Sequence, residues 1–260
     1  MRRLVRQRSF RIAERAFVAE GARVLEAAVA AGAPIEALYV APDVEASKSA
    51  NSVVIAAHES GIRVYELATG VMERVADAVT PQPILGVVAM LDVDLAAVVG
   101  ASPLIVCVDV RDPGNLGTII RSADAAGAAG VICCAGSGDL YNPKAVRSSA
   151  GSIFHIPLVV APSAAETLDV LGAAGVRRLS TVMRGGDDYS TADLSGLVAI
   201  VLGNEASGLG SYLDESLDGA LTIPIDGRAE SLNVAMTASV LCFEFARRRR
   251  VGALGPSMTK

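Results

Sequence analysis

The sequence has no tryptophan, few aromatic residues (4%), only two histidines and only four cysteines among its 260 residues. The cysteines lie in apolar runs without the spacing of metal ligands, so neither a disulfide framework nor a Cys/His zinc site is expected, and we predict no metal. No apolar stretch reaches about 18 residues without a break, and no apolar signal core follows the N-terminal arginines. We therefore expect a soluble cytoplasmic protein with no membrane partner. The four cysteines are Cys107, Cys133, Cys134 and Cys242.

Positive charge is not in excess. The 23 Lys and Arg against 28 Asp and Glu give a net charge of −5, which argues against a wholly basic nucleic-acid coat but allows a local basic patch. Residues 1–23 are rich in arginine, which could neutralise RNA phosphates or simply form a solvated helix face. We interpret Arg247 to Arg250 as the C-terminus of a helix, where positive charges interact favourably with the helix dipole. The N-terminal arginines are Arg2, Arg3, Arg6, Arg8, Arg11, Arg15 and Arg23.

The hydrophobic content of 52% supports a folded core and excludes disordered and collagen-like classes. We predict three parts: a small α/β domain over residues 1–93, a linker over 94–102, and a larger domain over 103–260. In the small domain the pattern predicts a helix that begins at Phe17 and stops near Gly32. The further predicted elements are strands at 37–40, 63–67 and 84–91 and helices at 53–60 and 69–79.

In the larger domain, predicted strands alternate with predicted helices. This rhythm is typical of an α/β fold with an open parallel sheet that is covered on both faces. The predicted strands are 104–109, 131–134, 156–159, 178–182, 197–202 and 221–225. The predicted helices are 116–126, 143–151, 164–174 and 232–249.

Ligand sites of such sheets form beyond the carboxyl ends of the strands, and three loops there carry polar residues. The first loop contains turn-forming residues followed by Asn115, Gly117 and Arg121. An ordinary turn with a surface arginine would have the same pattern. The second, over 203–210, is a glycine-rich turn that brings backbone groups to a ligand. Its spacing fits neither a dinucleotide fingerprint nor a P-loop, which makes a nicotinamide-dependent dehydrogenase remote. In that loop, Glu205 alone could be a solvated acid.

The third loop, over 223–235, leads into the last helix. Ser231 is well placed to be the N-cap of that helix, and this role competes with a catalytic one. Asn233, in the first turn of an otherwise apolar helix, is harder to explain by packing.

Together the loops resemble the three motifs of the SpoU (TrmH-type) family of RNA 2′-O-ribose methyltransferases, which belongs to the SPOUT superfamily. The family pattern N-x-G-x-x-x-R appears as Asn115, Gly117 and Arg121. The pattern L-G-x-E-x-x-G-L appears as Leu202, Gly203, Glu205, Gly208 and Leu209. The pattern I-P-M-x-G-x-x-x-S-L-N-V appears at 223–227 and 231–234, with Ile225 in place of methionine. Residues 17–27 resemble the small RNA-binding domain that precedes the catalytic domain in many members.

The resemblance implies a trefoil-knotted SPOUT fold preceded by a small domain of the L30e-like type. It implies S-adenosylmethionine as methyl donor, structured RNA as substrate (most often 23S ribosomal RNA), and a homodimer formed through helices near the site, here the last helix with Val240, Leu241, Phe243 and Phe245. The implied cofactor-binding residues are Gly203, Ile223, Leu232, Leu202 and Gly208. The implied catalytic residues are Arg121, Asn115, Glu205, Asn233 and Ser231.

For Arg121 we favour an electrostatic role over a base role, because a guanidinium is a poor proton acceptor in water. Two alternatives stay open within the resemblance. One is a transfer-RNA ribose 2′-O-methyltransferase, although such members often lack the N-terminal domain. The other is a non-catalytic RNA-binding protein on the same fold, against which the intact Arg121, Glu205 and Asn233 count.

Overall fold

The computed structural model describes residues 1–76 and 80–252, and these form two compact units. The first unit combines Met1–Leu91 with Asp139–His155, and the second combines Asp92–Gly138 with the chain from Ile156 onward. The grouping by contacts therefore assigns 139–155 to the first unit, whereas the sequence pattern places them in the larger domain. The domain boundaries at 93 and 103 stay predictions. The predicted linker contains one short 3₁₀ helix, Leu95–Ala97.

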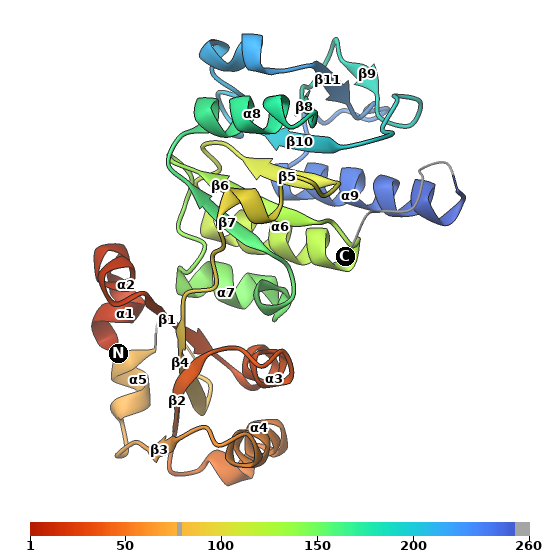
Figure 1. Cartoon of the computed structure of the whole chain (residues 1–260). Coiled ribbons are helices and arrows are strands. Elements are labelled where there is room, and N and C mark those ends of the chain that lie inside the picture. Colours follow the sequence, from red (N-terminus) through yellow and green to blue (C-terminus); the bar gives the residue numbers. More distant parts are fainter. Residues whose placement is uncertain (77–79, 253–260) are drawn as a thin grey trace. The chain divides into compact units, whose positions relative to one another are not determined.

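The first unit is built on a four-stranded sheet with the order β1-β4-β2-β3 (Figure 1). Its strands are β1 (Ala16–Glu20), β4 (Ile84–Ala89), β2 (Ile35–Val40) and β3 (Val64–Glu66). Strand β4 runs antiparallel to both β1 and β2, while β3 is parallel to β2. Its helices are α1 (Arg2–Arg6), α2 (Arg8–Glu14), α3 (Ala22–Ala30), α4 (Lys48–Glu59), α5 (Val71–Val75) and α7 (Pro143–Ser149).

The helix predicted to begin at Phe17 is wrong over its first residues, which form β1. All five residues of β1 are buried, so the strand shows no alternation of polar and apolar side chains that could reveal it. The helix itself begins at Ala22, after Gly21 adopts a φ of 100°. The predicted helix at 69–79 is observed as α5, and its last residues, 77–79, lie outside the described part of the chain. The pattern did not predict α1 and α2.

One of the N-terminal arginines is a structural residue of the first unit. Arg11 is 2% exposed, and its Nε donates to Oδ2 of Asp139 at 2.8 Å. Its Nη1 donates to the carbonyl oxygens of Leu4 and Val5. These two bonds connect α1 to the Arg11 side chain. Arg11 therefore cannot serve an RNA surface, unlike the exposed members of the cluster. Those exposed members are Arg2, Arg3, Arg6, Arg8, Arg15 and Arg23.

The segment 139–155 packs on β1 of the first unit. The Phe17 ring lies 4.8 Å from the ring of Tyr141 and 6.3 Å from that of Phe154, measured between centroids. The buried Glu20 carboxylate pairs with Arg147 of α7 at 3.4 Å. Together with the Arg11–Asp139 pair, these contacts join residues that are more than 120 positions apart in the sequence.

The second unit is built on a seven-stranded sheet with the order β7-β6-β5-β10-β8-β11-β9, and every pairing in it is parallel. The predicted parallel α/β sheet is thus confirmed, while the trefoil knot stays a prediction. The two-residue strand β9 has no signal in the sequence. The strands are β7 (Leu158–Ala161), β6 (Gly130–Cys134), β5 (Leu104–Cys107), β10 (Val198–Leu202), β8 (Arg177–Thr181), β11 (Gly219–Thr222) and β9 (Asp187–Asp188).

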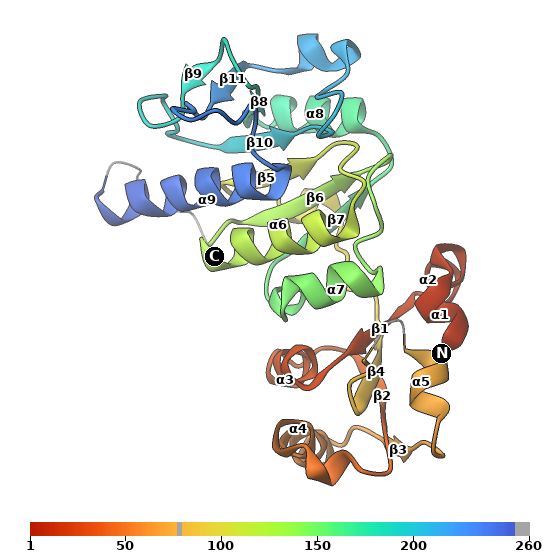
Figure 2. The ribbon, with the colours of Figure 1, turned by 180° about the vertical axis from the view of Figure 1, so that it is seen from behind.

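Helices cover both faces of this sheet (Figures 1 and 2). On one face, alternate residues of the central strands pack against α8 (Ala164–Ala173), as the cluster of Val106, Val201 and Leu168 shows. On the other face lie α6 (Pro113–Ala125) and α9 (Val234–Arg250), which pack against each other. Because side chains alternate along a strand, buried strands with both faces covered read as continuous apolar runs.

The arginines at the end of α9 do more than answer the helix dipole, and that interpretation is incomplete. Arg248 is buried and donates to the carbonyl oxygens of Ala192 and Tyr189 at 2.6 and 2.7 Å. Arg249 donates to the carbonyl oxygens of Gly127 and Ala126 just after α6. Hydrogen bonds from the neighbouring arginines, that from Arg247 foremost, lower the pKa of Glu244 to about 2. These arginines therefore fasten α9 to its surroundings.

The four cysteines are free and buried, and burial raises the pKa of Cys242 to about 12. Over residues 1–76 and 80–252, no set of His, Cys, Asp or Glu side chains is grouped as metal ligands would be. In the same part of the chain, every helix is too short or too polar to cross a bilayer.

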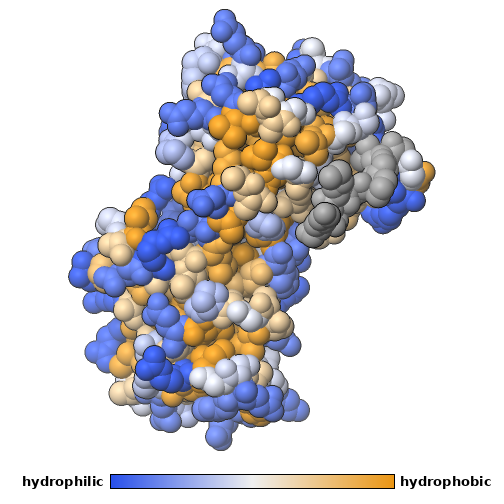
Figure 3. Space-filling model, viewed as in Figure 1, coloured by the Kyte–Doolittle hydropathy of each residue, from blue (hydrophilic) through white to orange (hydrophobic). Residues whose placement is uncertain are grey.

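On the face drawn in Figure 3, hydrophobic patches are bordered by hydrophilic residues.

We predict that Arg11→Ala destabilises the protein by about 3 kcal/mol, because the Asp139 carboxylate, only 12% exposed, would lose its ion-pair partner and keep only the Tyr141 N–H. The matched control is Arg8→Ala, at an exposed position one helical turn earlier, where a change within about 0.5 kcal/mol is expected. Urea unfolding followed by circular dichroism measures both. Equal stability of the two variants would contradict a structural role for Arg11.

Candidate active site

The three loops picked out by the sequence follow β5, β10 and β11 of the second unit. Because the strands are parallel, their carboxyl ends meet at one edge of the sheet. From β5 the chain proceeds outward through β6 and β7, whereas β10 and β8 lie on its other side. The first and second loops therefore flank the point at which the strand order reverses, which is where open parallel sheets bind ligands.

Three predicted site residues, one from each loop, form a hydrogen-bonded network. The amide Nδ2 of Asn115 donates to Oε1 of Glu205. The amide Nδ2 of Asn233 donates to the same Oε1 at 3.4 Å and to Oδ1 of Asn115 at 3.2 Å. Two amides and one carboxylate from positions up to 118 residues apart thus converge at the sheet edge. We call Asn115, Glu205 and Asn233 the amide–carboxylate network.

Each of the two asparagines is fixed by a helix start. Asp112 caps α6, since its carboxylate accepts from the backbone N–H of Asn115 at 3.0 Å. Asn233 caps α9, since its Oδ1 accepts from the N–H of Ala235 at 2.9 Å. The prediction that Ser231 caps this helix is therefore wrong, and the helix begins at Val234 rather than 232. Ser231 is exposed and lies outside the network.

The second loop is closed tightly on itself. Gly203 is buried, and a side chain there would come within 2.6 Å of the Gly208 carbonyl carbon. Asn204 and Gly208 exchange two backbone hydrogen bonds of 3.0 and 2.9 Å. The Asn204 side chain accepts from the N–H groups of Ala206 and Ser207. Asn204 is not among the residues predicted from the sequence, although an asparagine at the start of a glycine-rich turn is a signal for such a loop.

The third loop has backbone N–H and C=O groups that are not bonded to other backbone groups of the described residues. Strand β11 ends at Thr222, three residues before the predicted end, so the chain from Ile223 onward leaves the sheet. Within the described residues, no backbone–backbone hydrogen bond involves positions 223–232. Ile223 and Leu232 are half-buried apolar residues at the two ends of this stretch. A flat, apolar ligand with polar edges fits free N–H and C=O groups flanked by apolar side chains.

Arg121 is not part of the amide–carboxylate network. It lies in the third turn of α6, about 9 Å further along the helix than Asn115 and roughly a third of a turn around it. Its side chain is exposed, and the described residues give it no hydrogen bond or ion pair. The guanidinium is therefore available to an anionic ligand.

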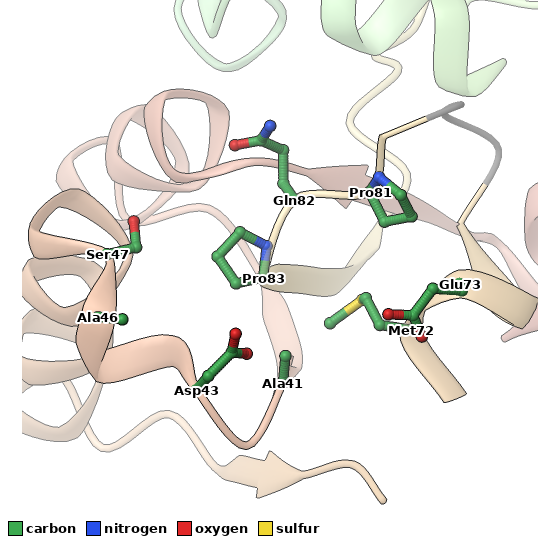
Figure 4. Close-up of a pocket in the computed structure, with 9 residues that line it drawn as sticks. All are labelled: Ala41, Asp43, Ala46, Ser47, Met72, Glu73, Pro81, Gln82 and Pro83. Carbon is green, nitrogen blue, oxygen red and sulfur yellow. The ribbon is translucent and has the colours of Figure 1, made fainter. Parts of the chain in front are cut away.

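Two cavities lie away from this edge. One, of about 360 Å³, is in the first unit, where the carboxylate-bearing Asp43 and Glu73 line it together with Met72 (Figure 4). The other, of about 590 Å³, lies between the end of α6 and α9 and is lined by Phe243 and Arg249 among others. No predicted site residue lines either cavity, and the candidate site is an open sheet edge.

Comparison with known proteins adds two family matches. Residues 102–243 match the SpoU rRNA Methylase family, and residues 1–86 match the MRM3-like substrate binding domain. The chain is 40% identical over 185 residues to the 23S rRNA (guanosine(2553)-2′-O)-methyltransferase RlmP of Bacillus subtilis, which covers 71% of this chain and 73% of that protein. It is 32% identical over 246 residues to the 23S rRNA (uridine(2479)-2′-O)-methyltransferase of Streptomyces viridochromogenes, covering 91% of this chain and 84% of that protein.

A solved structure is also similar over nearly the whole chain. The SpoU methyltransferase AviRb from Streptomyces viridochromogenes, in complex with AdoMet, superposes with a TM-score of 0.84 and 30% identity. The match covers 96% of both chains.

Proposed function

The chain belongs to the SpoU rRNA methylase family, and we propose that it transfers a methyl group from S-adenosylmethionine to a ribose 2′-hydroxyl of 23S ribosomal RNA. The observation that carries this proposal is the amide–carboxylate network, in which the three motif loops bring Asn115, Glu205 and Asn233 together at the sheet edge. These groups can hold a ribose by its hydroxyls, because an amide donates and accepts while a carboxylate accepts.

Ribosomal RNA is favoured over transfer RNA by two observations. Both named relatives act on 23S rRNA, and each matches beyond the catalytic region. The first unit resembles a substrate-binding domain, and its exposed arginines supply cations for a phosphate backbone. Incubation of the protein with labelled S-adenosylmethionine and either 23S rRNA or transfer RNA, followed by mapping of ribose methylation, separates the two substrates.

The chemistry requires activation of a weakly acidic alcohol. The 2′-oxygen forms a bond to the methyl carbon as the carbon–sulfur bond breaks, the hydroxyl proton leaves, and the thioether departs neutral. Arg121 is exposed and carries a guanidinium, so we assign it to the phosphate next to the ribose and to the developing alkoxide. A phosphate oxygen or water then takes the proton. The network orients the ribose toward this guanidinium.

The methyl donor is held by backbone groups in this proposal. When bound, S-adenosylmethionine supplies a methyl group made electrophilic by its positive sulfur. The open stretch 223–232 and the tight turn at Gly203 suit a ligand recognised by N–H and C=O groups. Ile223 and Leu232 would flank the flat base, with Leu202 and Gly208 completing the surroundings.

We further propose a homodimer in the cytoplasm. The last helix, α9, exposes Met236 (61%) and Phe243 (46%), and Phe243 lines the cavity beside the end of α6. A second copy would cover these apolar side chains. The other residues that the sequence suggested for this interface add less exposed apolar surface. Leu241 and Phe245 are buried in the second unit, and Val240 is half-buried. Free cysteines are typical of a reducing compartment.

Gly203→Ala should weaken binding of S-adenosylmethionine at least about tenfold, roughly 1.4 kcal/mol, because the new methyl group would push the 203–208 turn open. Isothermal titration calorimetry measures the affinity. Gly100→Ala is the control, since a side chain there meets nothing within 4 Å. Affinities equal to wild type in both variants would contradict cofactor binding at this turn.

Arg121→Ala should lower turnover on the order of a hundredfold or more, the scale expected for losing one donor to a developing oxyanion. Arg121→Lys should restore only part of it, because an ammonium lacks the bidentate fork. Single-turnover methylation across pH measures both. If Arg121 were instead a base, the wild-type rate would rise with pH along a titration that both variants lose. A wild-type rate in the alanine variant would overturn either role.

Phe243→Glu should convert the dimer to monomers, because it places a charge in the apolar surface of α9. Val170→Glu on α8 is the control, since Val170 has a similar exposure of 47% but lies on the helix that covers the other face of the sheet. Light scattering at micromolar concentration measures the mass. A monomeric wild-type protein would contradict the dimer.

A further inference from the structure

Asp109, just beyond β5, has an unusual backbone conformation. Its φ is 56°, in the left-handed region that non-glycine residues rarely enter, and among the non-glycine residues of the described ranges only Arg15 and Ala150 also have a positive φ. Such a conformation persists only where the surroundings fix it, and it occurs preferentially at functional sites. Asp109 lies outside the family motifs quoted above.

The segment around Asp109 is held from two sides. On one side, the Asn204 side chain donates to the Asp109 carbonyl oxygen at 3.0 Å, which joins the segment to the loop that carries Glu205. On the other, Ser137 Oγ accepts from the Val110 N–H at 3.3 Å, and the Gly138 N–H donates to the Val110 carbonyl at 2.9 Å. The Asp109 carbonyl and both backbone polar groups of Val110 are therefore hydrogen-bonded.

Two glycines let the chain approach this segment closely. A side chain at Gly138 would come within 2.6 Å of the Arg111 carbonyl oxygen. A side chain at Gly136 would lie 3.2 Å from Oδ1 of Asp109, and Gly136 itself has a φ of 93°. The turn at 136–138 is thus shaped around the Asp109–Arg111 backbone and the Asp109 carboxylate.

The fixed backbone of Asp109–Arg111 and the Asp109 carboxylate hold the Arg111 guanidinium in one orientation. Arg111 Nε donates to Oδ1 of Asp109 at 2.9 Å, and Nη2 donates to Oδ2 at 3.0 Å, so that two parallel bonds fix the plane of the group. The Arg111 side chain is nevertheless 74% exposed. Its Nη1 has no partner among the described residues. The hydrogen bond to Asp109 raises the pKa of Arg111, which keeps it charged.

We propose that Arg111 binds a backbone phosphate of the RNA close to the ribose that is methylated, and that Asp109 is a positioning residue that orients Arg111. The inference rests on the proposed function and adds a substrate contact outside the family motifs. Arg111 stands four residues before Asn115, and the 204–109 hydrogen bond connects it to the loop of Glu205. A phosphodiester suits the donors that Asp109 leaves free, the two Nη1 hydrogens and the second Nη2 hydrogen, because its two unbridged oxygens accept side by side.

The first experiment compares Arg111→Ala with Arg177→Ala. Arg177 also pairs with an aspartate, Asp193, but it begins β8 and so lies at the amino edge of the same sheet. Filter binding to a 23S rRNA transcript should show an affinity about tenfold weaker for Arg111→Ala, the loss of one charged hydrogen bond. The slope of log affinity against log salt should become shallower by roughly 0.7–0.9, one phosphate contact. Arg177→Ala should match wild type in both measurements.

The outcomes separate this inference from the proposed function. Wild-type protein that fails to methylate 23S rRNA would count against the proposed function itself. In an active enzyme, an unchanged salt slope for Arg111→Ala would overturn the phosphate contact alone. If Arg111→Ala instead weakened S-adenosylmethionine binding in calorimetry, with the RNA salt slope intact, the anion would be the cofactor carboxylate and the inference would be wrong.

Asp109→Asn tests the positioning role. Asparagine tolerates the left-handed conformation, so the backbone should be retained while the charged fork is lost. We expect a severalfold rise in KM for RNA with kcat near wild type and with the wild-type salt slope, because Arg111 still contacts phosphate but must be ordered on binding. A salt slope reduced as in Arg111→Ala, or a KM equal to wild type, would contradict positioning by Asp109.

Discussion

The parallel pairing of β5 with β10 is the constraint on which the site depends. These strands are about 95 residues apart, yet Cys107 pairs with Leu202 and the Val108 N–H donates to the Leu202 carbonyl at 2.8 Å. The register fixes where each strand ends, and the loops that follow must begin side by side. A slip of one residue would turn Leu202 to the opposite face and displace Gly203 from its contact with Gly208. The geometry of the candidate site is therefore set by the hydrogen bonds between the backbones of two strands.

The amide–carboxylate network converts this shared edge into a defined arrangement of polar groups. Asn115 and Asn233 each sit at the start of a helix, so their positions are determined by capping as well as by their mutual bonds. Since Asn233 Oδ1 is used by the cap, its Nδ2 is left to bridge the other two residues. A network whose donors are already directed loses little conformational freedom when a ribose binds. The backbone of 203–208 is likewise fixed before a ligand binds, so it also loses little conformational freedom.

The arginines divide into those that hold the fold together and those that stay exposed and available to an anion near the candidate site. Arg11, Arg248 and Arg249 donate to carbonyl oxygens and hold helices in place, a role that the sequence did not predict for any of them. Arg121 and Arg111 are exposed at the second unit's helix α6 and the loop before it. Guanidinium groups serve both purposes because five N–H donors suit buried carbonyls as well as phosphates. Burial decides between them, and burial is a property of the fold.

The sequence by itself determined the α/β class and the parallel sheet, because buried strands read as apolar runs. The residues of the network were picked out by the resemblance of three loops to family motifs. It did not determine the β1 strand, whose residues are buried on both faces, or the cap of α9, for which Ser231 and Asn233 compete two residues apart. Only the tertiary structure decided that Asn204 reaches Asp109, that Arg11 meets Asp139, and that Arg111 is held as a fork. The first two contacts join positions 95 and 128 residues apart, and the third depends on a left-handed backbone that distant residues impose. Local patterns encode local structure, whereas such partners are chosen by the packing of the whole chain.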